Sequence, residues 1–288
     1  MGDNALDTDE VAAIYDELLK TYEKQWEYQG HRSLHLGYYD DDHDEPGPAA
    51  MNTMRILSDA ADISNGDRVL NIGCGAGEDS VWNARAHDAT VVGINISEAQ
   101  LELAREHASN HGVEEETEFR YDDFHKLETI ADTSIDVVWG LEALSHSSDR
   151  QKALAQAQRV LVDDGRVAFT DIFLRPNAGP LSDEQKSQLK QINDALGIRV
   201  GPITLFEKAL ETTGYGNIEI RNMSGGVLQS TKRRSRFSKV ASPVGRVLDT
   251  LGKESPVQVE AFEAHSNIHN FVKNGVIGYY LITAEASD

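Results

Sequence analysis

Two residues capable of acid–base chemistry follow an apolar segment near the middle of the chain. The segment 135–141 is predicted to be a buried strand, and Glu142 and His146 come soon after it. Because ligand sites in open parallel sheets form at the carboxyl ends of strands, we expect both side chains to point into a crevice. A histidine titrates near neutral pH, so His146 is the candidate general base, and Glu142 would orient it or hold a cationic substrate. The alternative is a histidine at a helix start that bonds only to local backbone.

A glycine-rich turn earlier in the chain must lie close to these residues. The stretch Arg68–Gly77 is a short apolar strand that breaks into Gly73, Gly75 and Gly77, and a helix is predicted over 78–86. Glycines spaced this closely let backbone N–H groups approach a bulky ligand at a helix N-terminus. Dinucleotides and S-adenosylmethionine are the two ligand classes that use this geometry.

The sixth position of the glycine pattern separates these two classes. A dinucleotide site has the spacing G-x-G-x-x-G, but Glu78 occupies the sixth position here. A carboxylate there would repel a pyrophosphate, whereas a sulfonium cofactor has no phosphate. The pattern therefore favours S-adenosylmethionine over a nicotinamide cofactor, and an ordinary glycine turn is the alternative. Cys74, inside the turn, is expected to pack there rather than to react.

Polar side chains end the next two predicted strands. Asn95 occupies the position that usually offers a side chain to the ribose hydroxyls in nucleoside-binding α/β folds. The following strand ends in Asp122, Asp123 and Phe124, where one carboxylate would accept the adenine amino group and the ring of Phe124 would cover the base. A solvated turn is the alternative for the acidic pair.

The N-terminal region is predicted to cover this edge of the sheet. Apolar residues at helical spacing predict an amphipathic helix over 9–28. The polar loop that follows carries His35, Gly37, Tyr38 and Tyr39, and we expect it to fold as a lid over the ligand. The spacing of the histidines in this loop gives poor support for a metal site, so no metal is expected.

The order of the predicted elements defines the fold class. Strands alternate with helices and close on the pair 217–221 and 276–284, which predicts an α/β fold with a doubly wound, mostly parallel seven-stranded sheet of Rossmann-like type. We assign residues 1–64 to N-terminal helices and a lid, residues 65–175 to the cofactor-binding core, and residues 176–288 to an inserted helical cap with the last strands. All three parts are expected to form one integrated domain.

Two helix starts carry capping signals. Ser97 with Gln100, and later Ser148 with Gln151, have the S-x-x-Q spacing of a capping box. The helix that Ser148 would start is expected to run to about Val162, before a fifth strand over 166–173.

The composition disfavours several classes of partner. The chain has 288 residues, with 48 Asp and Glu against 27 Lys and Arg, for a formal net charge of -21. Such a charge disfavours nucleic acid and anionic membranes as partners, and it is similar to the surface charge of proteins from salt-accumulating, halophilic organisms. The single cysteine excludes an internal disulfide. We find no membrane-spanning run and no signal peptide in the sequence, so a cytoplasmic protein is expected.

Together these motifs resemble the class I S-adenosylmethionine-dependent methyltransferases. The resemblance rests on V-L-N-I-G-C-G-A-G at 69–77, I-N-I-S at 94–97, D-D-F at 122–124 and R-V-L-V-D-D-G at 159–165. Within that family, L-H-L-G-Y-Y at 34–39 and W-G-L-E-A-L-S-H-S-S-D-R at 139–150 look most like the sarcosine/dimethylglycine N-methyltransferases. The same motifs are also similar to those of the sterol and tocopherol methyltransferases.

The resemblance implies a role for each motif. It places the methionine part of the cofactor beside Gly73, Gly75 and Gly77, the ribose beside Asn95 and Ile96, and the adenine beside Asp123 and Phe124, with Cys74, Gln100 and Leu141 as further cofactor contacts. Relatives of this group carry an acidic residue and a histidine four residues apart, which match Glu142 and His146. The chain departs from the family pattern at Asn71, where most members have an acidic residue, and at Asn95, where many have Asp or Glu.

The expected activity is methyl transfer from S-adenosylmethionine to a small molecule. The resemblance favours an amine acceptor such as a methylated glycine. C-methylation of a lipophilic isoprenoid, sterol or quinone is one alternative, and a catalytically inactive partner subunit that binds the cofactor is another. Tyr38 and Tyr39 would cover the cofactor or contact an ammonium group by cation–π attraction. The basic cluster 232–239 would hold an anionic group of the substrate or be a solvated helix face, and a homo-oligomer is compatible with the sequence.

Overall fold

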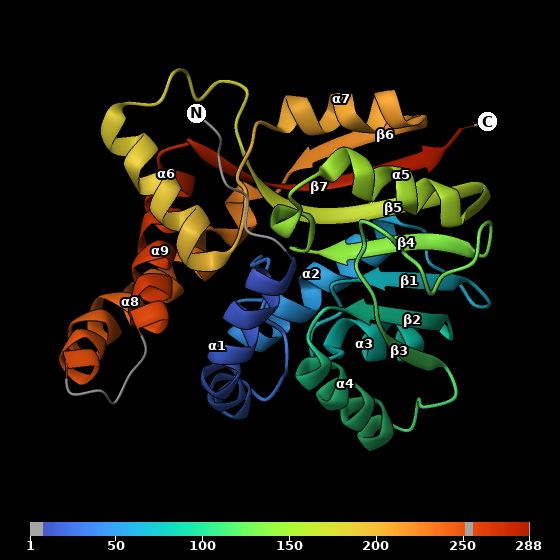
Figure 1. Cartoon of the computed structure of the whole chain (residues 1–288), viewed down its shortest axis with the longest axis horizontal. Coiled ribbons are helices and arrows are strands. Elements are labelled where there is room, and N and C mark those ends of the chain that lie inside the picture. The colour runs from blue at the N-terminus through green and yellow to red at the C-terminus, as the bar shows by residue number, and fades with distance from the viewer. Residues whose placement is uncertain (1–7, 251–255, 288) are drawn as a thin grey trace.

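A seven-stranded sheet forms the centre of the protein in the computed structural model, which describes residues 8–250 and 256–287 (Figure 1). The strand order is β3-β2-β1-β4-β5-β7-β6. Strands β1 to β5 pair in parallel, whereas β7 runs antiparallel to both β5 and β6. The strands are β1 Arg68–Ile72, β2 Thr90–Asn95, β3 Thr117–Tyr121, β4 Ile135–Leu141, β5 Leu161–Leu174, β6 Tyr215–Asn222 and β7 Ile277–Ala286. The predicted α/β fold with a mostly parallel sheet is confirmed.

Helices cover both faces of the sheet and divide the core into two clusters. On one face lie α2 Pro46–Ala60, α3 Glu78–His87 and α4 Glu98–His111, and on the other lie α5 Arg150–Val160 and α7 Ile203–Thr213. Successive residues of β1 point to opposite faces, so Val69 joins the first cluster and Leu70 the second. Because both faces are covered, the central strands are apolar on both sides.

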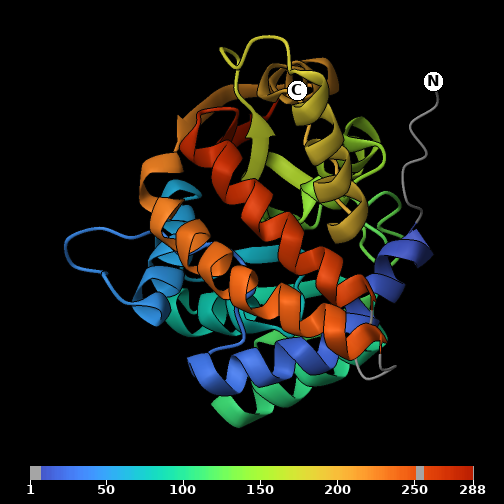
Figure 2. The same cartoon turned by 90° about the vertical axis from the view of Figure 1, so that its left-hand side faces the viewer.

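A layer of four helices lies at the end of the sheet toward which the parallel strands point. It contains α1 Thr8–Gln29, α6 Asp183–Leu196, α8 Ser224–Thr250 and α9 Pro256–Lys273 (Figures 1 and 2). Helix α9 packs against α8, α6 and α1, which ties this layer together. The strand ends that carry candidate site residues therefore lie beneath this layer of helices. None of the helices in the described residues is long and apolar enough to cross a membrane.

The structure corrects two predicted boundaries. Ser148 is not the N-cap of α5, because Asp149 takes that position and its side chain accepts a hydrogen bond from the Lys152 N–H at 3.0 Å. A carboxylate one residue further on caps a helix as well as a hydroxyl does. Strand β5 begins at Leu161 rather than at residue 166, because Leu161 pairs with Ile135 of β4 before the register shifts.

Asp79 makes the stability of the protein depend on pH. It lies in the first turn of α3, and its carboxylate accepts a hydrogen bond from the Trp139 ring N–H at 3.2 Å. Burial raises the pKa of Asp79 to about 6, against about 3.9 for an unfolded chain. The folded state therefore binds the proton more tightly, and this stabilisation is complete below about pH 4 and is lost as the pH rises through about 6.

We expect Asp79→Asn to remove this pH dependence. A difference of about two pKa units corresponds to about 2–3 kcal/mol, so the variant should gain roughly that much relative to wild type between pH 4.5 and 7.5. Urea unfolding at both pH values measures the difference. The matched control is Asp88→Asn at the exposed end of the same helix. In this variant the free energy of unfolding should change with pH as it does in wild type. A parallel pair of stability curves for Asp79→Asn and wild type would contradict the prediction.

Candidate active site

The glycine turn after β1 is tightly packed at two of its three glycines. Gly73 has φ +67°, and a Cβ there would lie 2.9 Å from the Cβ of Ala143. Gly77 has φ +86°, and a Cβ there would lie 2.8 Å from the Cβ of Ala104. At Gly75 a Cβ would meet only the Gln100 side-chain oxygen, at 3.8 Å. Gly73 and Gly77 therefore bring the chain close to its neighbours, and Gly75 leaves space in front of the turn.

Cys74 packs inside this turn as expected. Its side chain is buried and its backbone N–H donates to the carbonyl of Ile94 at 3.0 Å, which fixes the turn against β2. Burial raises the pKa of the Cys74 thiol well above its usual value, so the thiol stays protonated and unreactive.

Glu78 connects the turn to the α1–α2 loop (residues 30–45). Its Oε2 accepts a hydrogen bond from the backbone N–H of Arg32 at 2.6 Å and lies 3.3 Å from Nε2 of His107. Burial raises the pKa of Glu78, but the nearby imidazole of His107 and the hydrogen bond from the Arg32 N–H outweigh it, and the net pKa is lowered. This carboxylate is thus satisfied by the protein itself and anchors the loop above the site.

Asn95 and Gln100 form an amide pair at the end of β2. Asn95 Oδ1 accepts from the Ile96 N–H at 2.8 Å, and its Nδ2 donates to Gln100 Oε1 at 2.8 Å. The capping box is therefore only half formed, because Ser97 Oγ accepts from the Gln100 N–H while the Gln100 side chain turns to Asn95. Gln100 Nε2 is buried without a hydrogen-bond partner. The pair offers a donor beside the open space at Gly75.

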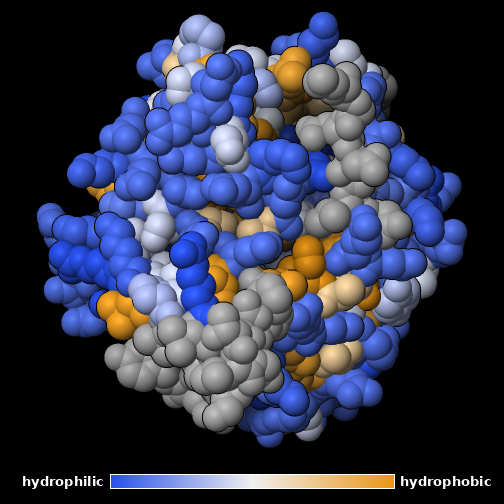
Figure 3. Space-filling view, turned by 60° about the vertical axis from the view of Figure 1, so that its left-hand side comes forward, coloured by the Kyte–Doolittle hydropathy of each residue, from blue (hydrophilic) through white to orange (hydrophobic). Residues whose placement is uncertain are grey.

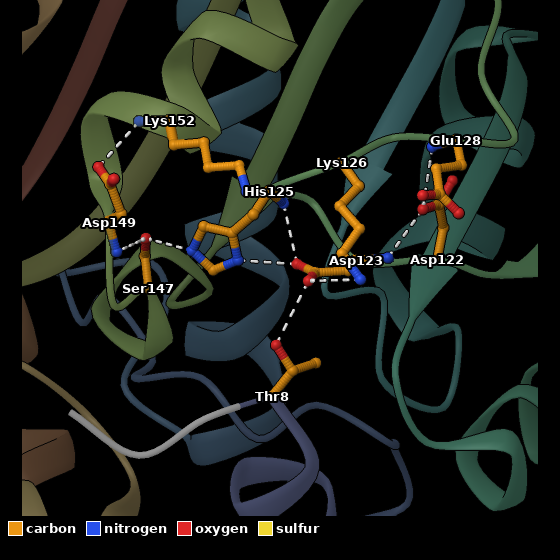
Figure 4. Close-up of polar contacts among 9 residues, drawn as sticks. All are labelled: Thr8, Asp122, Asp123, His125, Lys126, Glu128, Ser147, Asp149 and Lys152. Carbon is orange, nitrogen blue, oxygen red and sulfur yellow. Dashed lines mark hydrogen bonds and ion pairs between the residues drawn. The ribbon is translucent and has the colours of Figure 1, made fainter. Parts of the chain in front are cut away.

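The two carboxylates after β3 have different roles. Asp122 Oδ2 accepts from both the backbone N–H and the hydroxyl of Thr129, at 2.8 and 2.6 Å, so it fixes the turn from a buried position and is not part of a solvated turn. Asp123 faces α1 instead, and its Oδ1 lies 2.7 Å from Nδ1 of His125 (Figure 4). Burial raises the pKa of Asp123, but the bonds from His125 overcome this effect and lower it to about 2. Phe124 packs on the second core cluster next to this carboxylate.

Glu142 holds the α1–α2 loop and does not orient His146. Its Oε1 accepts from the backbone N–H of Leu36 at 2.6 Å, and its carboxylate also bonds to the hydroxyl of Tyr279. Burial raises the pKa of Glu142, with Arg234 nearby acting in the opposite direction. Leu141, the residue before it, is buried in the first core cluster.

His146 lies in a short 3-10 turn, Leu144–His146, and has a defined tautomer. Its Nδ1 lies 2.9 Å from the carbonyl oxygen of Gly197, and its Nε2 lies 2.8 Å from the hydroxyl of Tyr15 in α1. A carbonyl can only accept, so Nδ1 carries the proton and Nε2 accepts from Tyr15. Burial lowers the pKa of His146 to about 4. The side chain is thus a neutral base whose lone pair faces α1.

The predicted lid residues are held by backbone contacts to α2 and α8. The Gly37 N–H donates to Ser230 Oγ at 3.2 Å, and the Tyr39 N–H donates to the carbonyl of Gly226 at 2.9 Å. The ring of Tyr38 lies where a Cβ of Gly226 would be, which shows that it packs on α8. His35 has a buried Nε2 without a partner, and burial lowers its pKa to about 4.

A comparison with protein families establishes the class of this fold. Residues 63–221, more than half of the chain, match the family model described as a methyltransferase domain. The chain belongs to this methyltransferase family.

The relatives of this methyltransferase act on several kinds of atom, as their names state. The 27-O-demethylrifamycin SV methyltransferase of Amycolatopsis mediterranei (strain S699) is 30% identical over 280 residues, which cover 97% of each chain. The glycine/sarcosine/dimethylglycine N-methyltransferase of Actinopolyspora halophila is 30% identical over 196 residues, which cover 68% of this chain and 34% of that protein. The predicted relation to the sarcosine/dimethylglycine group is confirmed, and the acceptor differs among the relatives.

Solved structures share the fold of this methyltransferase. The [4+2]-cyclase SpnF superposes with a TM-score of 0.83 at 20% identity, covering 100% of this chain and 99% of that chain. A geranyl diphosphate methyltransferase in complex with SAM superposes with a TM-score of 0.71 at 18% identity, covering 88% of this chain and 98% of that chain. The protein is an S-adenosylmethionine-dependent methyltransferase, as expected from its motifs.

The structure shows two site residues that the sequence did not indicate, Tyr15 and His125, and it gives one member of the predicted basic cluster specific partners. Tyr15 contacts the candidate base, but the helical pattern of α1 marks its apolar face and gives no signal for this hydroxyl. Arg234 belongs to the basic cluster, yet its guanidinium donates to the carbonyls of Leu34 and His35, whereas its cationic neighbours in the cluster are exposed. His125 directly follows the D-D-F motif, and this adjacency was the signal that could have revealed it.

Proposed function

We propose that this methyltransferase methylates a hydroxyl group of a small molecule, with His146 as the general base. The observation that carries the proposal is the Tyr15 hydroxyl, which already donates to Nε2 of the neutral imidazole at 2.8 Å. That distance is the one a base needs to take a proton from an acceptor hydroxyl. The Amycolatopsis relative, which matches this chain from end to end, is named for the methylation of an oxygen atom, and this supports the same acceptor class.

The residues around the glycine turn fit the cofactor. We assign the open space at Gly75, flanked by Gly73, Cys74 and Gly77, to its methionine part, and the amide pair of Asn95 and Gln100, with Ile96, to its ribose. Asp123, Phe124 and Leu141 would contact the adenine. The unpartnered Gln100 Nε2 supports this assignment, because a buried donor without a partner costs about 1–3 kcal/mol unless a ligand satisfies it. When bound, S-adenosylmethionine supplies a methyl group on a positively charged sulfur.

The protein contributes positioning and one proton transfer. Nε2 of His146 takes the proton of the acceptor hydroxyl, and the carbonyl of Gly197 stabilises the imidazolium that forms, through the Nδ1–H bond. The acceptor hydroxyl replaces that of Tyr15 on Nε2. Orientation of reactants in such a site is worth about 7–11 kcal/mol. Helix α1 and the α1–α2 loop exclude water from the reacting groups.

The surface over the helical layer suits an acceptor with an apolar body. On the face shown in Figure 3, hydrophobic residues lie near the centre within a hydrophilic surround. Phe237 and Val240 of α8 are among the large hydrophobic residues that remain exposed. A methylated glycine is a small zwitterion, so it would cover little of such an apolar surface.

The charges near Glu142 weigh against an amine acceptor. An amine that binds in its protonated form, before it loses its proton, would need a free carboxylate, but Glu142 bonds to Leu36 N–H and Tyr279, and Arg234 lies in its electrostatic range. The pKa of Glu142 is raised by burial, which further weakens it as a cation site.

The deciding experiment is methyl transfer from labelled S-adenosylmethionine to matched acceptors. We expect labelled methyl ether from a hydroxylated macrocycle or phenol, and none from sarcosine or dimethylglycine. Turnover of the methylated glycines without any ether product would overturn the proposal. Calorimetric binding of S-adenosylhomocysteine is measured in parallel, so that a protein without a working cofactor site is distinguished from a failed acceptor choice.

The pH dependence of the reaction tests His146 separately. Because its pKa is lowered to about 4, the imidazole is already neutral at pH 6, and protonation would remove the base only as the pH falls through about 4. We expect kcat/KM to be level from pH 6 to pH 9. A rise in kcat/KM centred near pH 6.5, the value of an unperturbed histidine, would contradict this placement of the proton.

A further inference from the structure

A chain of hydrogen bonds runs from Asp123 to the start of α5. His125 Nδ1 lies 2.7 Å from Asp123 Oδ1, and His125 Nε2 lies 2.8 Å from Ser147 Oγ (Figure 4). The backbone N–H of His125 also donates to Asp123 Oδ1, at 2.9 Å. The chain ends at Asp149, the N-cap of α5, whose N–H donates to Ser147 Oγ at 3.2 Å. Both His125 and Ser147 are buried, with exposed fractions of 8% and 3%.

The bond between His125 and Asp123 has one direction. The pKa of Asp123 is about 2, so its carboxylate can only accept, and Nδ1 of His125 must carry the proton. The Ser147 oxygen accepts from the Asp149 N–H and lies 2.8 Å from Nε2 of His125, so it holds the other side of the imidazole ring. Because the ring is held in this way and both donors of His125 reach the same carboxylate oxygen, Asp123 has a fixed rotation.

The rotation leaves one oxygen of Asp123 facing α1. Oδ1 takes both bonds from His125, whereas Oδ2 accepts, among the described residues, a single long bond from the hydroxyl of Thr8, at 3.3 Å, and lies 4.0 Å from the Lys126 ammonium (Figure 4). Thr8 is the first residue of α1. Oδ2 is therefore the oxygen that a ligand donor can reach.

We propose that His125, braced by Ser147, is a positioning residue that fixes the Asp123 carboxylate so that Oδ2 accepts the amino group of the adenine. The proposal rests on the placement of adenine at Asp123 in the proposed function. His125 and Ser147 would then help the site to select adenine over other purines. A carboxylate held in one orientation repels a base that has a carbonyl oxygen where adenine has its amino group.

The same order of side chains occurs in nucleophilic serine triads, but the surroundings of Ser147 differ. Its oxygen accepts the Asp149 N–H and is almost fully buried, which lowers its nucleophilicity and its access to a substrate. The network therefore serves to fix Asp123 and does not activate the serine. Labelling of Ser147 by a fluorophosphonate would overturn this conclusion.

The test compares the binding of two product analogues by calorimetry. S-adenosylhomocysteine carries the amino group, and S-inosylhomocysteine carries a carbonyl in its place. We expect wild type to bind the adenine form about 10- to 100-fold more tightly, as for one hydrogen bond to a charged group. His125→Leu should lower this ratio to below about threefold. His125→Asn, which can keep a donor at the place of Nδ1, should retain most of it, and Ser147→Ala should lie between them.

Two further variants separate the possible failures. If Asp123→Ala leaves the affinity ratio of the two analogues at the wild-type value, adenine does not bind at Asp123, and that assignment in the proposed function is wrong. If Asp123→Ala removes the ratio while His125→Leu and Ser147→Ala keep it, only the positioning role fails. His43→Leu is the matched control, because His43 makes the same 2.7 Å bond to Asp40 at the surface, and its ratio should not change.

A spectroscopic measurement keeps the inference testable if His125→Leu does not fold. The nitrogen-15 spectrum of the unliganded wild-type protein should show His125 protonated at Nδ1. In Ser147→Ala the same tautomer should persist with faster ring motion. A spectrum with the proton on Nε2 would overturn the proposal, since Asp123 Oδ1 would then lack its side-chain donor.

Discussion

Replacement of His146 by asparagine is expected to lower kcat by about 100- to 10,000-fold, while the affinity for S-adenosylhomocysteine changes less than threefold. The loss follows from the removal of Nε2, the acceptor that bonds to the Tyr15 hydroxyl at 2.8 Å. General-base contributions of this size are typical where a positioned side chain takes a proton in the transition state. Initial rates of methyl ether formation and calorimetry measure the two effects.

Two variants serve as controls for this prediction. Tyr15→Phe removes the hydroxyl that the acceptor replaces and keeps the ring, so kcat should stay within about tenfold of wild type. His265→Asn removes another histidine whose pKa burial lowers to about 4 and whose Nδ1 lies 2.6 Å from the Ala261 carbonyl, so it should leave kcat nearly unchanged. If His146→Asn behaved like His265→Asn, another group would have to be the base.

The second large effect is expected at Gly77. Gly77→Ala forces a side chain into φ +86° and places its Cβ 2.8 Å from the Cβ of Ala104. The left-handed backbone costs about 1–2 kcal/mol and the overlap about 1–3 kcal/mol, so the free energy of unfolding should fall by roughly 2–5 kcal/mol. Cofactor binding should weaken with it, because the turn and the start of α3 shift together. Urea unfolding and calorimetry measure both losses.

The chain offers variants that divide this cost into its two parts. Gly112→Ala has a similar φ, +66°, with nothing within 4 Å of the added Cβ, so it should show only the backbone cost. Adding Ala104→Gly to Gly77→Ala removes the overlap of the two methyl groups and should recover part of the stability, less about 1 kcal/mol for a glycine inside α4. If Gly77→Ala and Gly112→Ala lowered the free energy of unfolding by the same amount, close packing against α4 would not be the reason for a glycine at position 77.

The sequence predicted those parts of the protein that depend on local patterns. The strand before Gly73, the glycine turn and the start of α3 are encoded within ten residues, and the structure has them where they were expected. The alternation of strands and helices in turn predicts a mostly parallel sheet, because parallel strands need crossover connections between them, but it does not give the strand order. The predicted seven-stranded fold is therefore confirmed.

The partners of the site residues could not be predicted, because they come from distant segments. Glu142 was expected beside His146, four residues away, but its carboxylate bonds to the backbone of residue 36. His146 itself bonds to residues 15 and 197, which only the packing of α1 and α6 brings near. A one-dimensional pattern shows which side chains lie at a strand end and not which helix covers them. The same reason explains why Tyr15 gave no signal, and why the bonds of Arg234 to the carbonyls of residues 34 and 35 could not be predicted.

The anchoring of the α1–α2 loop has a consequence for how this protein can change its substrate during evolution. Glu78 and Glu142 hold the loop through the N–H groups of residues 32 and 36, and every amino acid except proline supplies such a group. Mutations can therefore alter the side chains that the loop presents without loosening its attachment. New acceptor preferences can arise in this segment by drift and selection, while the machinery that binds the cofactor is inherited intact.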